Sequence, residues 1–247
     1  MSSRQHLDRL LNDYRRQVLR WNRQINLVSR LDTEEMLQGL IHQCRGAWDR
    51  LTASGSAGLS SAADLWYFDL GSGAGLPGFV WHAQAVAGGL PVRTWLVEPR
   101  EKRAWFLNRL NNLGCPEPVI VRSARWGDLA GDDFGVPAGE PAPSHVLISL
   151  KALHLTDVQV LEGLNPLLSH LGPVAGDGGP VTVLIVRFYP PEQAWNQKLA
   201  DDLEIPGPGG VHDLAGRSFR GLGGKILPAL SPRGAGLVLS AYMTDPA

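Results

Sequence analysis

Apolar residues recur at intervals of three and four along the first 28 positions, which is the spacing of one face of an α-helix. We therefore predict an amphipathic helix from residue 2 to about residue 28, with a capping box formed by Ser2 and Gln5. Its opposite face carries six arginines, which suit either a solvated surface or a basic surface for a phosphate backbone. The apolar stripe consists of Leu7, Leu10, Leu11, Tyr14, Val18, Trp21 and Ile25.

A second helix is predicted from Thr33 to Leu51. Asp32 is a suitable N-cap, and two glutamates lie in the first turn, where the helix dipole favours negative charge. The following stretch, Thr52 to Ala63, is rich in serine, glycine and alanine and is typical of a loop. It separates a helical prefix from the rest of the chain.

Short apolar runs alternate with helical patterns in that remaining part. Strands are predicted at residues 65–68, 92–97, 119–121, 145–149, 181–186 and 236–242. Helices are predicted at residues 79–87, about 100–113 and 158–171, and loops at residues 131–144 and 172–180. This order is typical of an α/β fold with a mostly parallel, doubly wound sheet, helices on both faces and a closing antiparallel hairpin. We predict an N-terminal helical extension at residues 1–63 and a Rossmann-like α/β domain at residues 64–247.

A glycine-rich stretch from Asp69 to Gly78, with the sequence DLGSGAGLPG, follows the first predicted strand. Its three alternating glycines allow the backbone to turn sharply and to approach a ligand closely. Pro77 suits the first turn of the helix that follows. Strand, glycine turn and helix in this order hold nucleotide-like cofactors at the carboxyl edge of parallel sheets. The alternative is a turn that only connects a strand to a helix.

The spacing within this stretch narrows the choice of cofactor. A dinucleotide fingerprint would need glycine where the chain has Leu76, and no Lys-Ser or Lys-Thr pair completes a phosphate-binding loop. A second acid, Glu98, ends the next strand, which is the layout of class I S-adenosylmethionine-dependent methyltransferases. In that layout Glu98 accepts hydrogen bonds from the ribose hydroxyls, and the loop amides and Asp69 hold the amino-acid end. The predicted cofactor-binding residues are Asp69, Gly71, Ser72, Gly73, Gly75, Leu76, Glu98, Pro99, Ala124 and Arg125.

Composition narrows the classes of protein to which the chain could belong. The chain has 247 residues, 44% of them hydrophobic, which is enough for one large domain or for a domain with an appended helical piece. It has no long uncharged apolar run, and its charged amino terminus argues against a secretory signal. Two cysteines without metal-ligand spacing favour a reduced, cytoplasmic protein without a metal. A formal net charge of −1 leaves any RNA binding to a local basic patch, and a monomer is favoured.

Several of these motifs together resemble one family, the bacterial 16S ribosomal RNA guanine-N7 methyltransferases, also called glucose-inhibited division protein B. The matching stretches are Arg20–Val28 (RWNRQINLV), Glu34–Leu37 (EEML), Asp69–Gly78, Leu96–Arg103 (LVEPREKR) and Phe106–Leu107. In order and spacing they cover roughly residues 10 to 130. The resemblance implies methyl transfer from S-adenosylmethionine to a guanine ring nitrogen, with ribosomal RNA or the small ribosomal subunit as the partner.

The chain departs from the family pattern on the substrate side. Leu40–Cys44 replaces a typical His-Ile-Leu-Asp-Ser, and Arg125–Gly127 replaces Arg-Ala-Glu. Lys151 lies near the position of an arginine in the family's Ser-Arg-Ala motif, and Arg187 replaces part of a Leu-Lys-Gly motif. Arg233 lies where the family places a basic residue before its last strand.

These departures still leave a set of cations suited to the predicted chemistry. Guanine N7 carries a lone pair and no proton, so the reaction needs positioning rather than a general base. We predict that Lys151 and Arg187 act at the acceptor base. Contacts to RNA phosphates or to the base are predicted for Arg100, Arg103, Lys151 and Arg233. Ordinary surface charges and ion pairs are the alternative for each of them.

Three functions remain open from the sequence. The first is methylation of guanine N7 in small-subunit ribosomal RNA. The second is a paralogue that methylates another RNA, a protein or a small molecule. The third is a non-catalytic ribosome-assembly factor that binds the cofactor.

Overall fold

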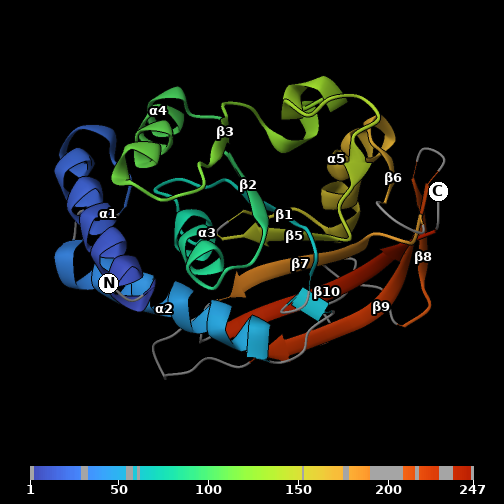
Figure 1. The fold of residues 1–247 in the computed structure, drawn as a ribbon, viewed down its shortest axis with the longest axis horizontal. Coiled ribbons are helices and arrows are strands. Elements are labelled where there is room, and N and C mark those ends of the chain that lie inside the picture. The colour runs from blue at the N-terminus through green and yellow to red at the C-terminus, as the bar shows by residue number, and fades with distance from the viewer. Residues whose placement is uncertain are drawn as a thin grey trace. The chain divides into compact units, whose positions relative to one another are not determined.

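The protein is described by a computed structural model (Figure 1). The described residues are 3–28, 33–53, 58–59, 62–151, 153–174, 178–189, 208–214, 217–227 and 236–245. The chain divides into two compact units, Met1–Ala124 and Arg125–Ala247. The boundary expected between residues 63 and 64 stays a prediction, although both N-terminal helices belong to the first unit together with the first three strands.

Two long helices, α1 (Ser3–Ile25) and α2 (Thr33–Ala53), begin the first unit, as the sequence predicts. The central part of the predicted stripe on α1 is buried, whereas Trp21 and Ile25 near its end are half-buried. Asn26 follows α1 with a positive φ of 56°, a left-handed conformation that ends the helix. The predicted capping residues Ser2 and Asp32 lie outside the described residues.

Three parallel strands form the sheet of the first unit: β1 (Leu65–Leu70), β2 (Val92–Val97) and β3 (Ile120–Arg122). Strand β2 lies between the other two, and every residue of β1 is buried. Aromatic side chains fill the contact between neighbouring strands, with Phe68 stacked on Trp95 at 4.6 Å between ring centroids. Parallel strands buried on both faces are expected to be continuously apolar, as β1 is.

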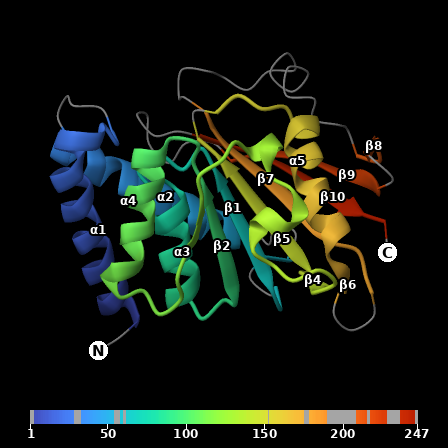
Figure 2. The same cartoon turned by 90° about the horizontal axis from the view of Figure 1, so that it is seen from above.

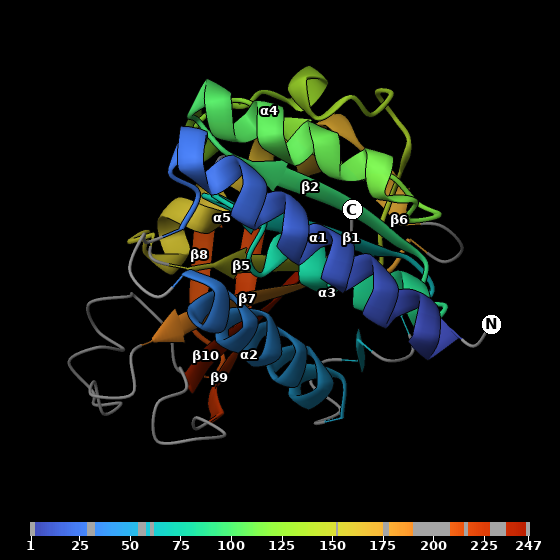
Figure 3. The same ribbon diagram turned by 90° about the vertical axis from the view of Figure 1, so that its left-hand side faces the viewer.

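Helix α3 (Gly78–Ala87) is buried on nearly all sides, from Gly78 to Ala85. It packs on β1 and β2 and is covered by α1 and α2, which lie beside it in Figures 2 and 3. A helix covered on several sides must be apolar around its whole circumference, which explains its sequence GFVWHAQAVA. The N-terminal helices therefore complete the core around the helix that follows the glycine-rich stretch.

Helix α4 (Glu101–Arg109) continues into a 3-10 turn, η2 (Leu110–Leu113). The turn stops at Gly114, whose φ is 82°, as predicted for a glycine in this position. The described residues of the first unit also include residues 58–59 of the predicted loop, which form part of a 3-10 turn.

The second unit contains two parallel strands, β5 (His145–Leu150) and β7 (Thr182–Tyr189), followed by an antiparallel set. Strand β10 (Gly236–Thr244) pairs with β7 and with β9 (Arg217–Leu227), and β9 pairs with β8 (Val211–Leu214). The antiparallel closing pair is thus confirmed as β9–β10, although the sequence pattern predicted no strand at β8 or β9.

Helix α5 (Asp157–His170) begins with a capping box in which Thr156 and Gln159 satisfy each other's backbone N–H groups. The two expected loops contain further short elements, namely η4 (Gly131–Phe134) and the parallel pair β4 (Pro141–Ala142) and β6 (Gly172–Val174). Another 3-10 turn, η3 (Trp126–Asp128), lies just before the first loop. The predicted α/β class is confirmed. Among the described helices, none combines the length and the apolar character needed to cross a membrane.

Candidate cofactor site

The glycine-rich stretch turns at the carboxyl ends of β1 and β2. Gly71, Gly73 and Gly75 have φ values of 71°, 56° and 92°, in the left-handed region that favours glycine. The amides of Gly71 and Ser72 both donate to the carbonyl of Val97, at 2.8 and 3.1 Å, and the amide of Gly75 donates to Ser72. The loop is therefore tied to the end of β2 by its own backbone. Sequence reasoning expected these amides to face a ligand, and in this conformation they donate within the protein.

Glu98, the acid predicted to bind ribose, follows β2 and is only 3% exposed. Its Oε2 accepts the N–H of Gly73 at 2.9 Å, and its Oε1 accepts the N–H of Arg100 at 3.0 Å. A carboxylate has about four lone-pair sites, so two bonds leave acceptor capacity for a ligand hydroxyl. Glu98 thus joins the glycine loop to the start of α4, and its role in binding ribose stays a prediction.

Asp69 ends β1 and is 1% exposed, with Oδ2 accepting the N–H of Gly78 at 3.1 Å at the start of α3. A Cβ on Gly78 would stand 2.5 Å from that oxygen and 2.5 Å from Leu96. Glycine at position 78 is therefore required for α3 to approach the strands closely, and Asp69 holds the first turn of the helix. Ser72 adds a bond from its hydroxyl to the carbonyl of Asp69 at 2.7 Å.

Tyr14 connects α1 to the glycine loop, which sequence reasoning missed because the residue fits an ordinary apolar stripe. Its side chain is fully buried, its hydroxyl donates to the carbonyl of Ala74 at 3.0 Å, and its ring packs on Phe79 at 5.1 Å between centroids. Burial, with the nearby Cys44 and Asp69, raises the pKa of Tyr14 well above its usual value, so the hydroxyl keeps its proton. The N-terminal helix thus helps to fix the loop.

Two of the predicted substrate-binding cations, Arg100 and Arg103, lie at the start of α4. The Arg103 guanidinium donates to the carbonyl of Asn26 at 2.9 Å and so fastens the end of α1. Arg100 is exposed. Both line a hollow of about 300 Å³ together with Lys102, Glu101 and the residues that end α1. This hollow carries three cations and one acid within the first unit, next to the backbone that Glu98 holds.

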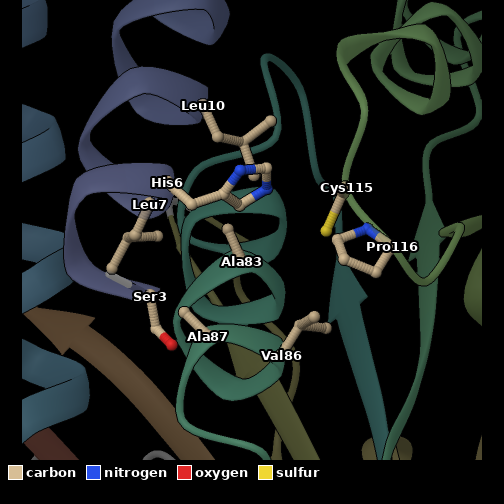
Figure 4. Close-up of a pocket in the computed structure, with 9 residues that line it drawn as sticks. All are labelled: Ser3, His6, Leu7, Leu10, Ala83, Val86, Ala87, Cys115 and Pro116. Atoms are coloured by element: carbon tan, nitrogen blue, oxygen red, sulfur yellow. The ribbon is translucent and has the colours of Figure 1, made fainter. Parts of the chain in front are cut away.

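A second cavity of about 340 Å³ lies between α1, α3 and the segment at Cys115 and Pro116 (Figure 4). Its walls are mostly apolar, and none of the predicted site residues lines it. His6 contributes an imidazole to its wall, and Cys115 contributes a thiol. Burial raises the pKa of the Cys115 thiol. A thiol with a raised pKa is a poor nucleophile. The cavity offers no chemistry that connects it to the glycine loop.

Of the predicted site residues that follow β3 along the chain, Ala124 ends the first unit and the others belong to the second. Ala124 is half-buried and Arg125 is exposed, and the carbonyl of Arg125 accepts the N–H of Asp128. Lys151 is half-buried, with its ammonium 5.7 Å from the centroid of the Phe188 ring. Arg233 lies outside the described residues.

Arg187, predicted to act at the acceptor base, lies in a buried ion pair. One of its terminal nitrogens bonds Asp157, and the other donates to the carbonyl of Leu155 at 2.9 Å. Asp157 is fully buried and also accepts the hydroxyl of Tyr242, whose pKa is raised by burial and by that carboxylate. These contacts give Arg187 a structural role, because they connect β7, α5 and β10. A catalytic role for it stays a prediction.

Trp126 occupies the position at which the chain departs from the expected Arg-Ala-Glu. Its indole N–H donates to the carbonyl of Val160 at 2.9 Å, and the side chain is 5% exposed. A Cβ on Gly163 would stand 2.2 Å from the indole nitrogen. This departure is therefore matched by a glycine in α5 that makes room for the larger side chain.

No group of three or more His, Cys, Asp and Glu side chains able to hold a metal occurs in the part of the chain that the structure describes. The fold, together with Asp69, the left-handed glycines and the buried Glu98, defines a class I methyltransferase-like α/β protein. Residues 7–122 match the model of one family, described as rRNA small subunit methyltransferase G (GidB). Over these residues, which make up a little less than half of the chain, this protein is similar to that family.

Two curated relatives carry the name ribosomal RNA small subunit methyltransferase G. The protein from Treponema denticola is 29% identical over 179 residues, which cover 64% of this chain and 65% of the relative. The protein from Cereibacter sphaeroides is 32% identical over 146 residues, which cover 59% of this chain and 65% of the relative. The match thus spans a little less than two thirds of each relative's length.

Solved structures with a similar chain course include an rRNA methylase from Streptococcus thermophilus, with a TM-score of 0.44 and 16% identity, covering 82% of this chain and 96% of that one. An S-adenosylmethionine-dependent methyltransferase from Aquifex aeolicus has a TM-score of 0.45 and 14% identity, covering 82% of this chain and 97% of that one.

Proposed function

We propose that this protein is an S-adenosylmethionine-dependent methyltransferase that acts on guanine N7 of small-subunit ribosomal RNA. The observation that carries the proposal is the buried Glu98 carboxylate at the end of β2, hydrogen-bonded to the glycine loop at Gly73. The match to the family model over residues 7–122, which include the whole loop and Glu98, supports the same cofactor. The names of the two relatives support ribosomal RNA as the acceptor.

When bound, S-adenosylmethionine would supply an electrophilic methyl group on a sulfonium. In that transfer a carbon–nitrogen bond to N7 would replace the carbon–sulfur bond, and the positive charge would pass from sulfur to the guanine ring. N7 has no proton to lose, and this chain therefore needs no general base. Its residues have to fix the ribose through Glu98, hold the loop rigid through Asp69 and Tyr14, and orient the acceptor in line with the methyl group.

The acceptor side would be served by cations. Arg100 and Arg103 line the hollow at the start of α4, and Arg103 already fastens α1. Of the two cations predicted to act at the base, Lys151 is the better candidate, because the Arg187 guanidinium is committed to Asp157. Arg233 remains proposed from its place in the sequence alone.

Two other functions predict different experimental results. Binding of S-adenosylmethionine without methyl transfer to any RNA would favour an assembly factor. Methyl transfer to a small molecule or a protein, but not to RNA, would favour a paralogue with another acceptor.

Mass mapping of small-subunit ribosomal RNA from a strain that lacks this protein tests the proposal. We expect one methylated guanine to be absent, to return with the wild-type gene and to stay absent with Glu98→Ala. Glu101→Ala, which removes an exposed carboxylate three residues away, is the matched control and should restore the mark. Identical RNA maps with and without the protein would contradict the ribosomal assignment.

A further inference from the structure

Two tryptophans and two arginines meet on the outer surface of α1 and α4. Trp21 and Trp105 pack edge to face, with ring centroids 4.8 Å apart and an interplanar angle of 78°. The guanidinium of Arg109 lies 5.3 Å from the Trp21 centroid and 5.1 Å from the Trp105 centroid. Arg20 lies 5.7 Å from the centroid of Trp21. We call these four residues the tryptophan–arginine cluster.

The exposure of Trp105 sets this cluster apart from a packing contact. Its side chain is 45% exposed, and it is the only aromatic among the large hydrophobic side chains that are exposed in the described part of the chain. The buried face of α4 is formed by Ala104, Phe106 and Leu107 without it. Leaving so large an apolar surface in water is unfavourable, which makes an exposed indole flanked by cations a sign of a binding surface.

The charges around the cluster select the kind of partner. Figures 2 and 3 show α1 and α4 side by side. From residue 16 onward, α1 presents three exposed arginines, and α4 with its N-cap presents three further exposed cations. The acid on these stretches is Glu101, and the partly exposed Asp13, one turn before Arg16 on α1, already pairs with that arginine. The exposed cations are Arg16, Arg20, Arg23, Arg100, Lys102 and Arg109.

We propose that the tryptophan–arginine cluster is a docking surface for a single-stranded segment of RNA. A base would stack on the exposed indole of Trp105 or on the Arg109 guanidinium, and neighbouring phosphates would pair with Arg20 and Lys102. Lys102 and Arg109 are seven residues apart, or about 10 Å along the helix, so one strand can contact both. A protein partner would favour a more neutral apolar surface, and six exposed cations favour a polyanion. The choice of RNA rests on the proposed function.

Binding of a fluorescein-labelled oligouridine of about 12 nucleotides, followed by anisotropy, tests this surface with the full chain. We expect Trp105→Ala to weaken binding about ten-fold and Trp105→Phe to restore most of it, because phenylalanine still stacks. Arg109→Ala should weaken binding and reduce the slope of affinity against salt by about one. Arg9→Ala is the matched control, since it removes an exposed arginine from α1 two turns or more away from the cluster, and should have a smaller effect.

Calorimetric affinity for S-adenosylmethionine, measured on the same variants, separates this inference from the proposed function. Unchanged cofactor affinity with weakened RNA binding supports the docking surface and shows that the variants are folded. Wild-type RNA binding by Trp105→Ala and Arg109→Ala overturns it, even if the protein methylates RNA. Loss of binding to a ribosomal protein, with RNA binding intact, overturns it in favour of a protein partner. A protein that binds RNA through this cluster but never binds the cofactor would refute the proposed function alone.

Discussion

Glu98→Gln tests the cofactor site most directly, because the substitution keeps the size of the side chain and removes its charge. The two carboxylate oxygens accept the N–H groups of Gly73 and Arg100, at 2.9 and 3.0 Å. A glutamine has one acceptor oxygen and one NH₂ group that only donates. In either orientation of the amide, one backbone N–H would therefore face a donor.

The magnitude follows from these two bonds. A hydrogen bond to a charged group contributes about 1.5–3 kcal/mol, and a buried donor left unpaired costs about 1–3 kcal/mol. Glu98 is 3% exposed, so water cannot readily replace the lost acceptor. We expect Glu98→Gln to lower the free energy of unfolding by about 2 kcal/mol and to weaken S-adenosylmethionine binding about ten-fold or more.

Urea unfolding followed by circular dichroism gives the first quantity, and isothermal titration calorimetry gives the second. Glu101→Gln is the control, because it makes the same change on an exposed side chain at the start of α4 and should alter neither quantity appreciably. Wild-type stability together with wild-type affinity in Glu98→Gln would refute the reasoning. Reduced stability with unchanged affinity would leave Glu98 as a support of the loop and remove it from the cofactor site.

Two further substitutions test the packing around the loop. Tyr14→Phe deletes the hydroxyl that donates to the buried carbonyl of Ala74, and should lower the free energy of unfolding by about 1 kcal/mol in urea; an unchanged midpoint would contradict the role given to α1. His82 is fully buried, and burial lowers its pKa from 6.5, so the unfolded chain takes up a proton first as the pH falls. Stability should therefore fall as the pH drops from the unfolded pKa of 6.5 through the lower folded pKa, and His82→Gln should show a flatter dependence between about pH 8 and about pH 5. Parallel pH profiles for the two proteins would show that His82 does not contribute.

The hydrogen bonds of His82 explain why its neutral form is favoured. Nε2 lies 2.8 Å from the carbonyl of Glu117, which can only accept, so this nitrogen carries the proton. Nδ1 lies 2.9 Å from the hydroxyl of Thr94 and accepts from it. Both ring nitrogens are satisfied without a charge. These partners lie 12 and 35 residues away along the chain, so no local sequence pattern identifies the role of this histidine.

The parts of the fold that could be predicted are those in which local sequence and tertiary environment agree. Strands β1 and β2 are short apolar runs, and the glycines at 71, 73 and 75 have the positive φ values that only glycine adopts readily. Strand β9 (Arg217–Leu227) was not predicted, because its three glycines and few large apolar residues give no strand pattern. Its place is fixed by pairing with β10 and β8, and such pairing cannot be deduced from a single segment.

The candidate site divides in the same way. The position of Glu98 beside the glycine loop could be predicted from its spacing, because the end of a strand next to a glycine turn is determined by local sequence. Arg187 shows what local sequence omits: its position after a predicted strand suggested a cation free to meet a base. Its partner Asp157 lies 30 residues away, at the first turn of α5, where a carboxylate is also favoured by the helix dipole. Removing either member would leave a buried charge unpaired, which costs more than the pair contributes. A loss of activity in Arg187→Ala alone could therefore result from unfolding as readily as from a lost catalytic group. Lys151 is half-buried and lies near an aromatic ring. It is the cation at which activity can be tested separately from stability.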